Sequence, residues 1–194
     1  MNRIEAFSDG VIAIIITIMV LELKTPEDHN LESLLKLMPI FLSYALSFLV
    51  TAIFWVNHHK LLRMTKKADG RLVWANIFWL FWLSLIPFVT AYMGNNHREP
   101  LAVALYAVVL TLASTAFTIL RYIVSREHLD NFELTEHHNK IHLKGLLSIF
   151  LYASSALLAF VSPYLSFAVF ILIPLSYFLS DRKLEKLSTK VTNE

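Results

Sequence analysis

Six long apolar segments, separated by shorter polar ones, run along this chain. They cover residues 6–23, 37–57, 72–93, 101–120, 145–161 and 164–179. Runs of about 17–25 apolar residues can cross the hydrocarbon core of a bilayer as α-helices. The last two runs are the shortest, and Pro163 between them favours a tight reversal, so we expect a helical hairpin there. The pattern predicts an all-α, polytopic membrane protein with six transmembrane helices.

The composition agrees with this class. Of the 194 residues, 56% are hydrophobic and 16% are charged, whereas a soluble domain has about 45–50% and about 25%. Six spans use most of the chain, so we expect residues 1–194 to form a single membrane domain. The chain contains no cysteine, which excludes disulfides, thiolate zinc sites and a cysteine nucleophile. The net charge of +2 does not indicate nucleic acid as a partner.

The positive charges fall mainly on one side of the predicted spans. Fourteen of the 17 Lys and Arg residues lie before the first span, in residues 58–71 and 121–144, or after residue 180. Only three lie on the other side, namely Lys24, Lys36 and Arg98. The positive-inside rule then predicts that both termini are cytoplasmic and that the number of spans is even. We expect a multi-pass protein of the plasma membrane.

Five polar side chains gather where the first three spans meet the cytoplasmic face. They are Ser8 and Asp9 on the first span, Asn57 and His58 on the second, and Asn76 on the third. Antiparallel threading places them at one depth, where they could hydrogen-bond across three helices. Ionisable groups inside a membrane are costly and usually functional. The alternative interpretation is that headgroups wet these residues, with Trp55 and Trp74 as ordinary anchors at the interface.

A second feature of the first span is an apolar stripe at helical spacing. Ile14, Thr17, Ile18 and Leu21 follow the i, i+3, i+4, i+7 pattern. Asp9 projects about 130° away from this stripe, so the polar cluster and the stripe use different faces. Taken alone, such a stripe is typical of a helix-packing seam or a lipid-facing surface. The chain has no Thr-Val-Gly-Tyr-Gly segment, which excludes a filter built from backbone carbonyls.

The start of the first span also carries a recognisable motif, Arg3-x-x-x-Phe7-Ser8-Asp9. It resembles the signature of the endolysosomal potassium channel family, transmembrane protein 175, and its prokaryotic six-span homologues. The likeness continues through residues 10–21, through Trp55-x-x-His58-His59, and through Asn76 followed by Leu85-Ile86-Pro87-Phe88. It covers the first three spans well, while the last three agree in number and hydropathy.

The resemblance implies a potassium-permeable cation channel in which the first helix of each subunit lines the pore. It also implies a homotetramer in the lipid bilayer, with monovalent cations as permeant ions and no cofactor. By resemblance, Ile14 forms the hydrophobic constriction, Ile18 and Leu21 form further apolar rings, and Thr17 forms a hydroxyl ring. The structural residues that tie the first helix to its neighbours are then Arg3, Phe7, Ser8, Asp9, His58 and Asn76.

A second class of function stays open, a proton-coupled secondary transporter. A carboxylate and an imidazole at one depth are the usual parts of a proton relay, and Asp9 with His58 or His59 would supply them. Current driven by voltage alone would favour the channel, whereas flux strictly coupled to pH would favour the transporter. We expect no enzymatic activity, because no nucleophile, base and orienting group converge at a recognisable spacing.

The segment between the fourth and fifth spans is polar and rich in histidine, and we predict a loop there. It contains Glu136-His137-His138 and His142, of which His138 and His142 are four residues apart. That spacing can bind a metal on a helix. Residues of this kind more often belong to a solvated loop, and we predict no metal site.

Overall fold

The computed structural model of the chain describes residues 2–26, 28–65, 69–126 and 132–191, and the side chains of all of these but residues 2, 64, 126, 132–141 and 178–191. Eight α-helices make up the described part of the chain. They are α1 (Asn2–Leu21), α2 (Leu31–Lys36), α3 (Met38–Met64), α4 (Gly70–Ser84), α5 (Ile86–Asn95), α6 (Pro100–Arg126), α7 (Phe132–Leu158) and α8 (Pro163–Val191).

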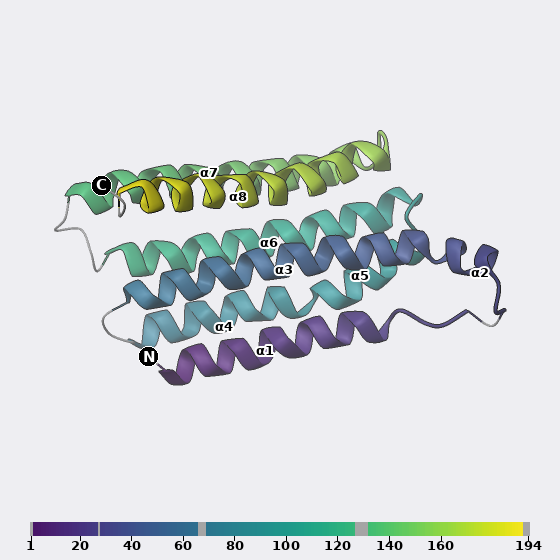
Figure 1. Cartoon of the computed structure of the whole chain (residues 1–194), viewed down its shortest axis with the longest axis horizontal. Helices are drawn as coiled ribbons and strands as arrows, with labels where there is room; N and C mark the ends of the chain where they lie inside the picture. Colours follow the sequence, from purple (N-terminus) through teal and green to yellow (C-terminus); the bar gives the residue numbers. More distant parts are fainter. Residues whose placement is uncertain (1, 27, 66–68, 127–131, 192–194) are drawn as a thin grey trace.

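The helices form an elongated bundle of antiparallel rods (Figure 1). α4 and α5 follow one another as a single rod, and the short α2 lies at one end. α1 forms one edge of the bundle and packs against α3, α4 and α5. The α7–α8 hairpin forms the opposite edge, and both termini lie at the same end of the molecule.

Four segments are long and apolar enough to cross a membrane. They are Arg3–Leu21, Met38–Arg63, Gly70–Asn95 and Pro100–Ser125. Two shorter apolar helices, His142–Leu158 and Pro163–Tyr177, form the hairpin expected at Pro163. The all-helical membrane architecture is therefore confirmed, while the number six for the crossings stays a prediction.

The third apolar segment is interrupted, which the sequence pattern did not predict. α4 ends at Ser84 and α5 begins at Ile86, with Leu85 between them. Pro87 has no N–H to donate to the carbonyl of Leu83, so the helical hydrogen-bond ladder loses a rung here. Pro87 is buried, and the break divides the rod near the middle of its length.

The prediction of a histidine-rich loop between the fourth and fifth spans is wrong for most of that segment. α6 continues to Arg126 and α7 begins at Phe132, so only a short connection separates two long helices. No glycine or proline occurs between residues 121 and 144 to end a helix. Polarity alone predicted a loop, although Leu, Glu, Lys and Arg are all good helix formers.

Small residues bring the helices close together in the core. α6 packs against α4, α5, α7 and α8, and Ala102, Ala107, Ala113 and Ala116 on it are fully buried. Small side chains at membrane helix interfaces allow close backbone approach. At Gly94 a Cβ atom would lie 3.1 Å from the Cα of Ile40 on α3, so α5 and α3 nearly touch there.

Candidate functional site

Three side chains from three helices form a buried hydrogen-bond network at the end of the bundle that holds the termini. Asn76 on α4 lies at its centre: its Nδ2 donates to Ser8 Oγ on α1 at 2.9 Å, and its Oδ1 pairs with His58 Nε2 on α3 at 2.8 Å. Because an amide oxygen only accepts, the His58 Nε2–H is the donor. All three side chains are at most 1% exposed. We call Ser8, His58 and Asn76 the buried network.

Local packing fixes each member of the buried network. The Ser8 hydroxyl donates to the carbonyl of Ile4 at 2.8 Å, one turn back on α1, and so can also accept from Asn76. The His58 ring stacks on Trp79 with 4.6 Å between ring centroids. Its Nδ1 has no hydrogen-bond partner within the described part of the chain. The network therefore joins α1, α3 and α4 through oriented, desolvated contacts.

Asp9 does not join this network, which corrects the expectation that it pairs with Ser8, His58 or Asn76. Its Oδ1 accepts a hydrogen bond from Trp55 Nε1 on α3 at 2.8 Å, on a partly exposed side of α1. Consecutive helix positions point about 100° apart, so Ser8 and Asp9 cannot face the same gap. Asp9 still ties α1 to α3, through a different pair of atoms.

A short contact between a histidine and a carboxylate lies one turn from the Asp9–Trp55 contact. His59 Nδ1 on α3 is 3.0 Å from Glu5 Oε1 on α1, and the His59 ring stacks against Trp55 at 5.8 Å. Both side chains of the pair are about one-third exposed. Two adjacent contacts thus hold the start of α1 along the end of α3.

Asn57 also departs from the expected cluster. Its Nδ2 donates to the carbonyl of Ile53 on its own helix at 2.8 Å, and its side chain lines a cavity on another side of α3. The reason is again rotation, because His58 and Asn57 are neighbours on α3 and point in different directions. Only one of the two amides in the predicted cluster bridges helices.

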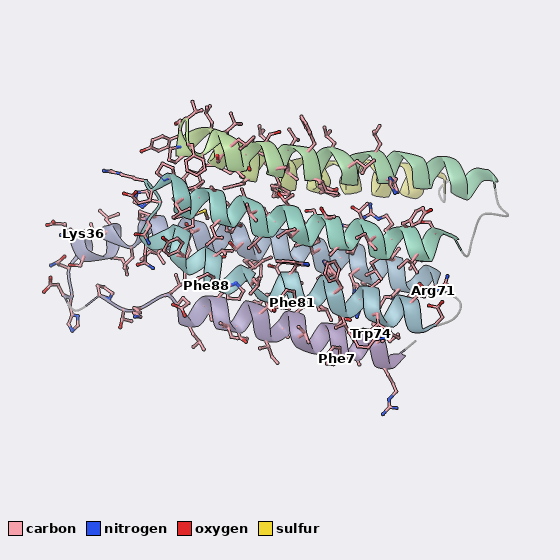
Figure 2. All side chains as sticks on the ribbon, turned by 180° about the vertical axis from the view of Figure 1, so that it is seen from behind. Phe7, Lys36, Arg71, Trp74, Phe81 and Phe88 are labelled. Carbon is pink, nitrogen blue, oxygen red and sulfur yellow. The ribbon has the colours of Figure 1, made fainter. Side chains whose placement is uncertain are left out.

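Arg3 and Phe7 lie on the outside of the single chain. Phe7 is 58% exposed (Figure 2), and Arg3 is exposed as well. Phe7 and Arg3 precede Ile14 by 7 and 11 residues, which are close to whole numbers of helical turns. All three residues therefore lie on the same side of α1. Arg3 and Phe7 make no hydrogen bond or ion pair within the described residues, so their place in the signature is not explained by contacts inside one chain.

The apolar stripe on α1 faces away from the bundle. Ile14, Ile18 and Leu21 are 58%, 44% and 77% exposed, and Thr17 is exposed with its hydroxyl donating to the Ile14 carbonyl at 2.9 Å. The opposite side of the helix is buried against α3, α4 and α5 through Ser8, Ile12, Ile15 and Met19. One face of α1 thus packs against its own chain, and the opposite face is exposed.

No group of three or more His, Asp or Glu side chains close enough to hold a metal is found among the described residues. His137 and His138 lie outside the described side chains, so the structure does not test the segment around them. His142 is described and belongs to α7.

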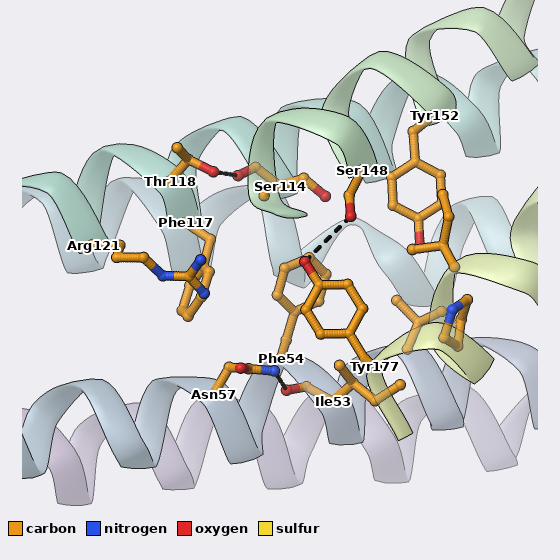
Figure 3. A pocket seen from close by; sticks show the side chains of 14 residues that line it. Ile53, Phe54, Asn57, Ser114, Phe117, Thr118, Arg121, Ser148, Tyr152 and Tyr177 are labelled. Carbon is orange, nitrogen blue, oxygen red and sulfur yellow. Dashed lines mark hydrogen bonds between the residues drawn. The ribbon is translucent and has the colours of Figure 1, made fainter. Parts of the chain in front are cut away.

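A cavity between α3, α6, α7 and α8 was missed by the sequence reasoning (Figure 3). Arg121, counted there as a charge flanking the fourth span, is only 6% exposed within α6. The continued apolar pattern at Ile123 and Val124 is the signal that could have placed it inside the bundle.

The revised position of Asp9 predicts a small effect of its neutralisation. Asp9→Asn keeps an oxygen that can accept from Trp55 Nε1, so we expect the free energy of unfolding to change by less than about 1 kcal/mol. Thermal unfolding of the purified protein in detergent measures this. A destabilisation as large as that of variants in the buried network would contradict the assignment.

Comparison with known proteins gives consistent matches. The family model described as "Endosomal/lysosomal potassium channel TMEM175" matches residues 3–87. A potassium channel of Chryseobacterium sp. (strain P1-3) is 42% identical over 95% of this chain and 96% of its own length. A potassium channel of Streptomyces collinus is 34% identical over 64% of this chain and 65% of its own length.

Longer and structurally characterised relatives match as well. The endosomal/lysosomal proton channel TMEM175 of Mus musculus is 28% identical over 92% of this chain, which spans only 36% of that protein. A crystal structure of a lysosomal potassium-selective channel TMEM175 homolog from Chamaesiphon minutus has a TM-score of 0.80 at 29% identity. That match covers 92% of this chain and 96% of the other. The family match at residues 3–87 includes the buried network and the exposed stripe.

Proposed function

This chain belongs to the TMEM175 family of ion channels, and on that premise we propose that it is a potassium-permeable channel whose pore is lined by α1 of four copies. Membership makes the protein a channel and not an enzyme. The relatives named potassium channels support potassium as the permeant ion. The whole chain acts as one channel domain in this proposal.

The observation that carries the pore assignment is the exposed face of α1. Ile14, Thr17, Ile18 and Leu21 point away from their own bundle, on a helix at its edge. Around a four-fold axis they would form apolar rings and one hydroxyl ring over about 10 Å of the path. A narrow apolar neck controls ion passage by dewetting, and hydroxyl oxygens can replace part of an ion's water shell.

The buried network positions α1 in this proposal. Ser8, His58 and Asn76 fix the cytoplasmic end of the helix against α3 and α4, and the Asp9–Trp55 bond adds a second tie to α3. These contacts set the rotation of α1 about its axis, and hence which side chains reach the pore. Arg3 and Phe7 are exposed on the same face of α1 as the stripe, and we assign them to contacts between copies.

The geometry does not favour the relay between Asp9 and His58 that a proton-coupled transporter would use. A relay between Asp9 and His58 needs the two side chains to exchange protons directly or through water. Asp9 instead accepts a hydrogen bond from Trp55, and His58 donates to Asn76 within the buried network.

A planar bilayer recording tests the function. With opposed potassium and sodium gradients, we expect an ohmic current whose reversal potential lies toward the potassium equilibrium potential. Flux that requires a pH gradient and carries no steady current would instead support the transporter.

Six crossings and two cytoplasmic termini complete the proposal, with the protein in the plasma membrane. The two termini share one end of the bundle, and so do the beginning of α4 and the end of α6, which carry Arg71 and Arg126. This distribution agrees with the positive-inside rule.

Cysteine labelling checks this topology. The chain has no native cysteine, so Arg71→Cys and Asn95→Cys each create a single reactive site, and both positions are exposed. In intact cells we expect an impermeant maleimide to label the variant at 95 and to label the variant at 71 only after permeabilisation. Labelling of both from outside would contradict the threading.

A further inference from the structure

Three exposed aromatic side chains form a row on α4, which packs beside α1. Trp74, Phe78 and Phe81 are 72%, 46% and 55% exposed, and Figure 2 shows Trp74 and Phe81 along the side of the bundle that also carries Phe7. Their i, i+4, i+7 spacing places them within about 60° of one another around the helix. We call Trp74, Phe78 and Phe81 the aromatic row.

The other flank of α1 carries three small, exposed residues, Ala6, Gly10 and Ala13. They project about 40–100° from Ile14 to one side. Ser8, which bonds to α4, projects about 120° from Ile14 to the other side. We call Ala6, Gly10 and Ala13 the small-residue face. The aromatic row and the small-residue face therefore lie on opposite sides of the stripe.

The fold of the single chain does not require the glycine at position 10. A Cβ atom at Gly10 would meet nothing within 4 Å among the described residues outside its own helix. Glycine weakens a helix relative to alanine, because it gains no contacts and loses more backbone freedom on folding. Small residues in membrane helices allow another helix to approach closely. Gly10 therefore fits a contact with a group outside its own chain.

The aromatic row and the small-residue face match in depth. The hydrogen bond between Asn76 and Ser8 places these residues at one level, and they are 68 positions apart. α1 and α4 both begin at the end of the bundle that holds the termini, and both rise about 1.5 Å per residue. Residues 68 positions apart on these helices therefore share a level. This offset pairs Trp74 with Ala6, Phe78 with Gly10, and Phe81 with Ala13.

The four-fold axis of the proposed channel brings these two surfaces together. Rotation about an axis along the bundle, in front of the stripe, keeps every residue at its own depth. The α4 side of one copy then faces the opposite flank of α1 in the next copy, as in any closed head-to-tail ring. Each large aromatic side chain meets a small residue at its own level.

The charges at the cytoplasmic ends of the two surfaces are also complementary. Arg71, one turn before Trp74, is exposed and forms no ion pair with the described residues. Glu5 and Asp9 point toward α3, next to the small-residue face, and remain partly exposed. With the same offset, Arg71 lies about 3 Å from the level of Glu5. Arg3 shares the level of Arg71 but lies on the stripe side of α1.

We propose that the aromatic row of one copy packs on the small-residue face of the next copy, and that four such contacts close the ring. The inference rests on the channel proposed above, because it uses the same axis. Aromatic side chains are enriched in the cores of protein interfaces. The closest approach falls at Gly10, one turn before Ile14, so this contact sets how tightly the four α1 helices surround the pore.

Disulfide cross-linking in membranes tests which residues meet. The chain has no native cysteine. We expect catalysed oxidation to join copies of Ala6→Cys/Trp74→Cys and of Ala13→Cys/Phe81→Cys into covalent dimers and larger species on a denaturing gel. The matched controls are the swapped pairs, Ala6→Cys/Phe81→Cys and Ala13→Cys/Trp74→Cys. Their members differ in level by about 10 Å, and a disulfide needs Cα atoms within about 7 Å, so these controls should stay monomeric on the gel.

Gly10→Leu tests the contact without cysteines. The space around Gly10 is open in the single chain, so leucine fits there without disturbing its own bundle. It would hold the neighbouring aromatic row away, and we expect the fraction of tetramer in detergent, measured by light scattering, to fall several-fold. Helical content measured by circular dichroism should stay unchanged. Ala153→Leu is the control, because Ala153 is exposed on α7 at the opposite edge of the bundle, and it should keep the tetramer.

Three results would overturn this interface and leave the channel proposal standing. They are a conducting wild-type tetramer whose level-matched pairs do not cross-link, equal cross-linking of matched and swapped pairs, and an unchanged tetramer fraction in folded Gly10→Leu. In each case lipid or other helices would cover the aromatic row. A wild type that is monomeric and carries no potassium current would overturn the interface and the channel together.

Discussion

Replacing Ile14 with asparagine is expected to raise the single-channel conductance several-fold and to weaken the preference for potassium over sodium. The exposed Ile14 side chain is assigned to the narrowest apolar ring of the pore. Four amides in place of four butyl groups would keep water in the neck and lower the barrier that dewetting creates. Single-channel recording and reversal potentials under mixed potassium and sodium conditions measure both changes.

Val20→Asn provides a matched control on the same helix. Val20 is 43% exposed, similar to Ile18, but it projects about 120° away from Ile14. The same change in chemistry at this position should leave conductance and selectivity as in the wild type. An equal gain of conductance in both variants would point to a general loosening of α1.

Thr17→Val separates the hydroxyl ring from the apolar rings. Valine keeps the shape of threonine but removes the hydroxyl. In the wild type this hydroxyl donates to the Ile14 carbonyl, and its oxygen also presents lone pairs to the exposed face. We expect a lower potassium preference with little change in open probability. If α1 uses this stripe only to pack against other helices, Ile14→Asn should disrupt assembly and Thr17→Val should not affect selectivity. Correctly assembled variants with wild-type permeation would refute the pore assignment.

Asn76→Leu is expected to be the most destabilising single change among the predicted site residues. Leucine has a similar volume but leaves Ser8 Oγ without its donor and His58 Nε2 without its acceptor, in surroundings that exclude water. Each buried group left unpaired costs about 1–3 kcal/mol. The melting temperature in detergent should fall by about 4 °C or more, given about 2–4 °C per kcal/mol for a chain of this size.

Asn57→Leu is the control for this prediction. It removes the same chemical group at nearly the same depth, but among the described residues the Asn57 amide bonds to its own helix, at the carbonyl of Ile53. Its melting temperature should stay close to that of the wild type. Equal destabilisation of the two variants would contradict the assignment of this loss of stability to the bridging hydrogen bonds of Asn76.

The depth of each residue could be predicted from the sequence because helices have a fixed rise per residue. Counting along antiparallel spans places Ser8, His58 and Asn76 at one level, and the structure joins these three. The i, i+3, i+4, i+7 spacing likewise separates the exposed stripe from the buried face of α1. Both inferences use only the geometry of a single helix.

The rotation of each helix about its axis could not be predicted in the same way. Ser8 and Asp9 are both polar and adjacent, and only packing decides that Ser8 faces α4 while Asp9 reaches Trp55. Hydropathy also hid Arg121, because a charge after an apolar run is normally taken as the end of the span. The cavity lies where four helices meet, and the periodicity of a single helix cannot predict which helices pack together.

The hydrogen bond between Ser8 and Asn76 also bears on how the chain is made. The two residues are 68 positions apart, so α1 leaves the ribosome well before its partner on α4 exists. At about 5–20 residues per second, the delay amounts to roughly 3–14 s. During this time the Ser8 hydroxyl can stay bonded to the Ile4 carbonyl on the same helix, and is not left unpaired in lipid. The first helix can therefore wait in the membrane as an independent unit, and its final docking coincides with the insertion of α4.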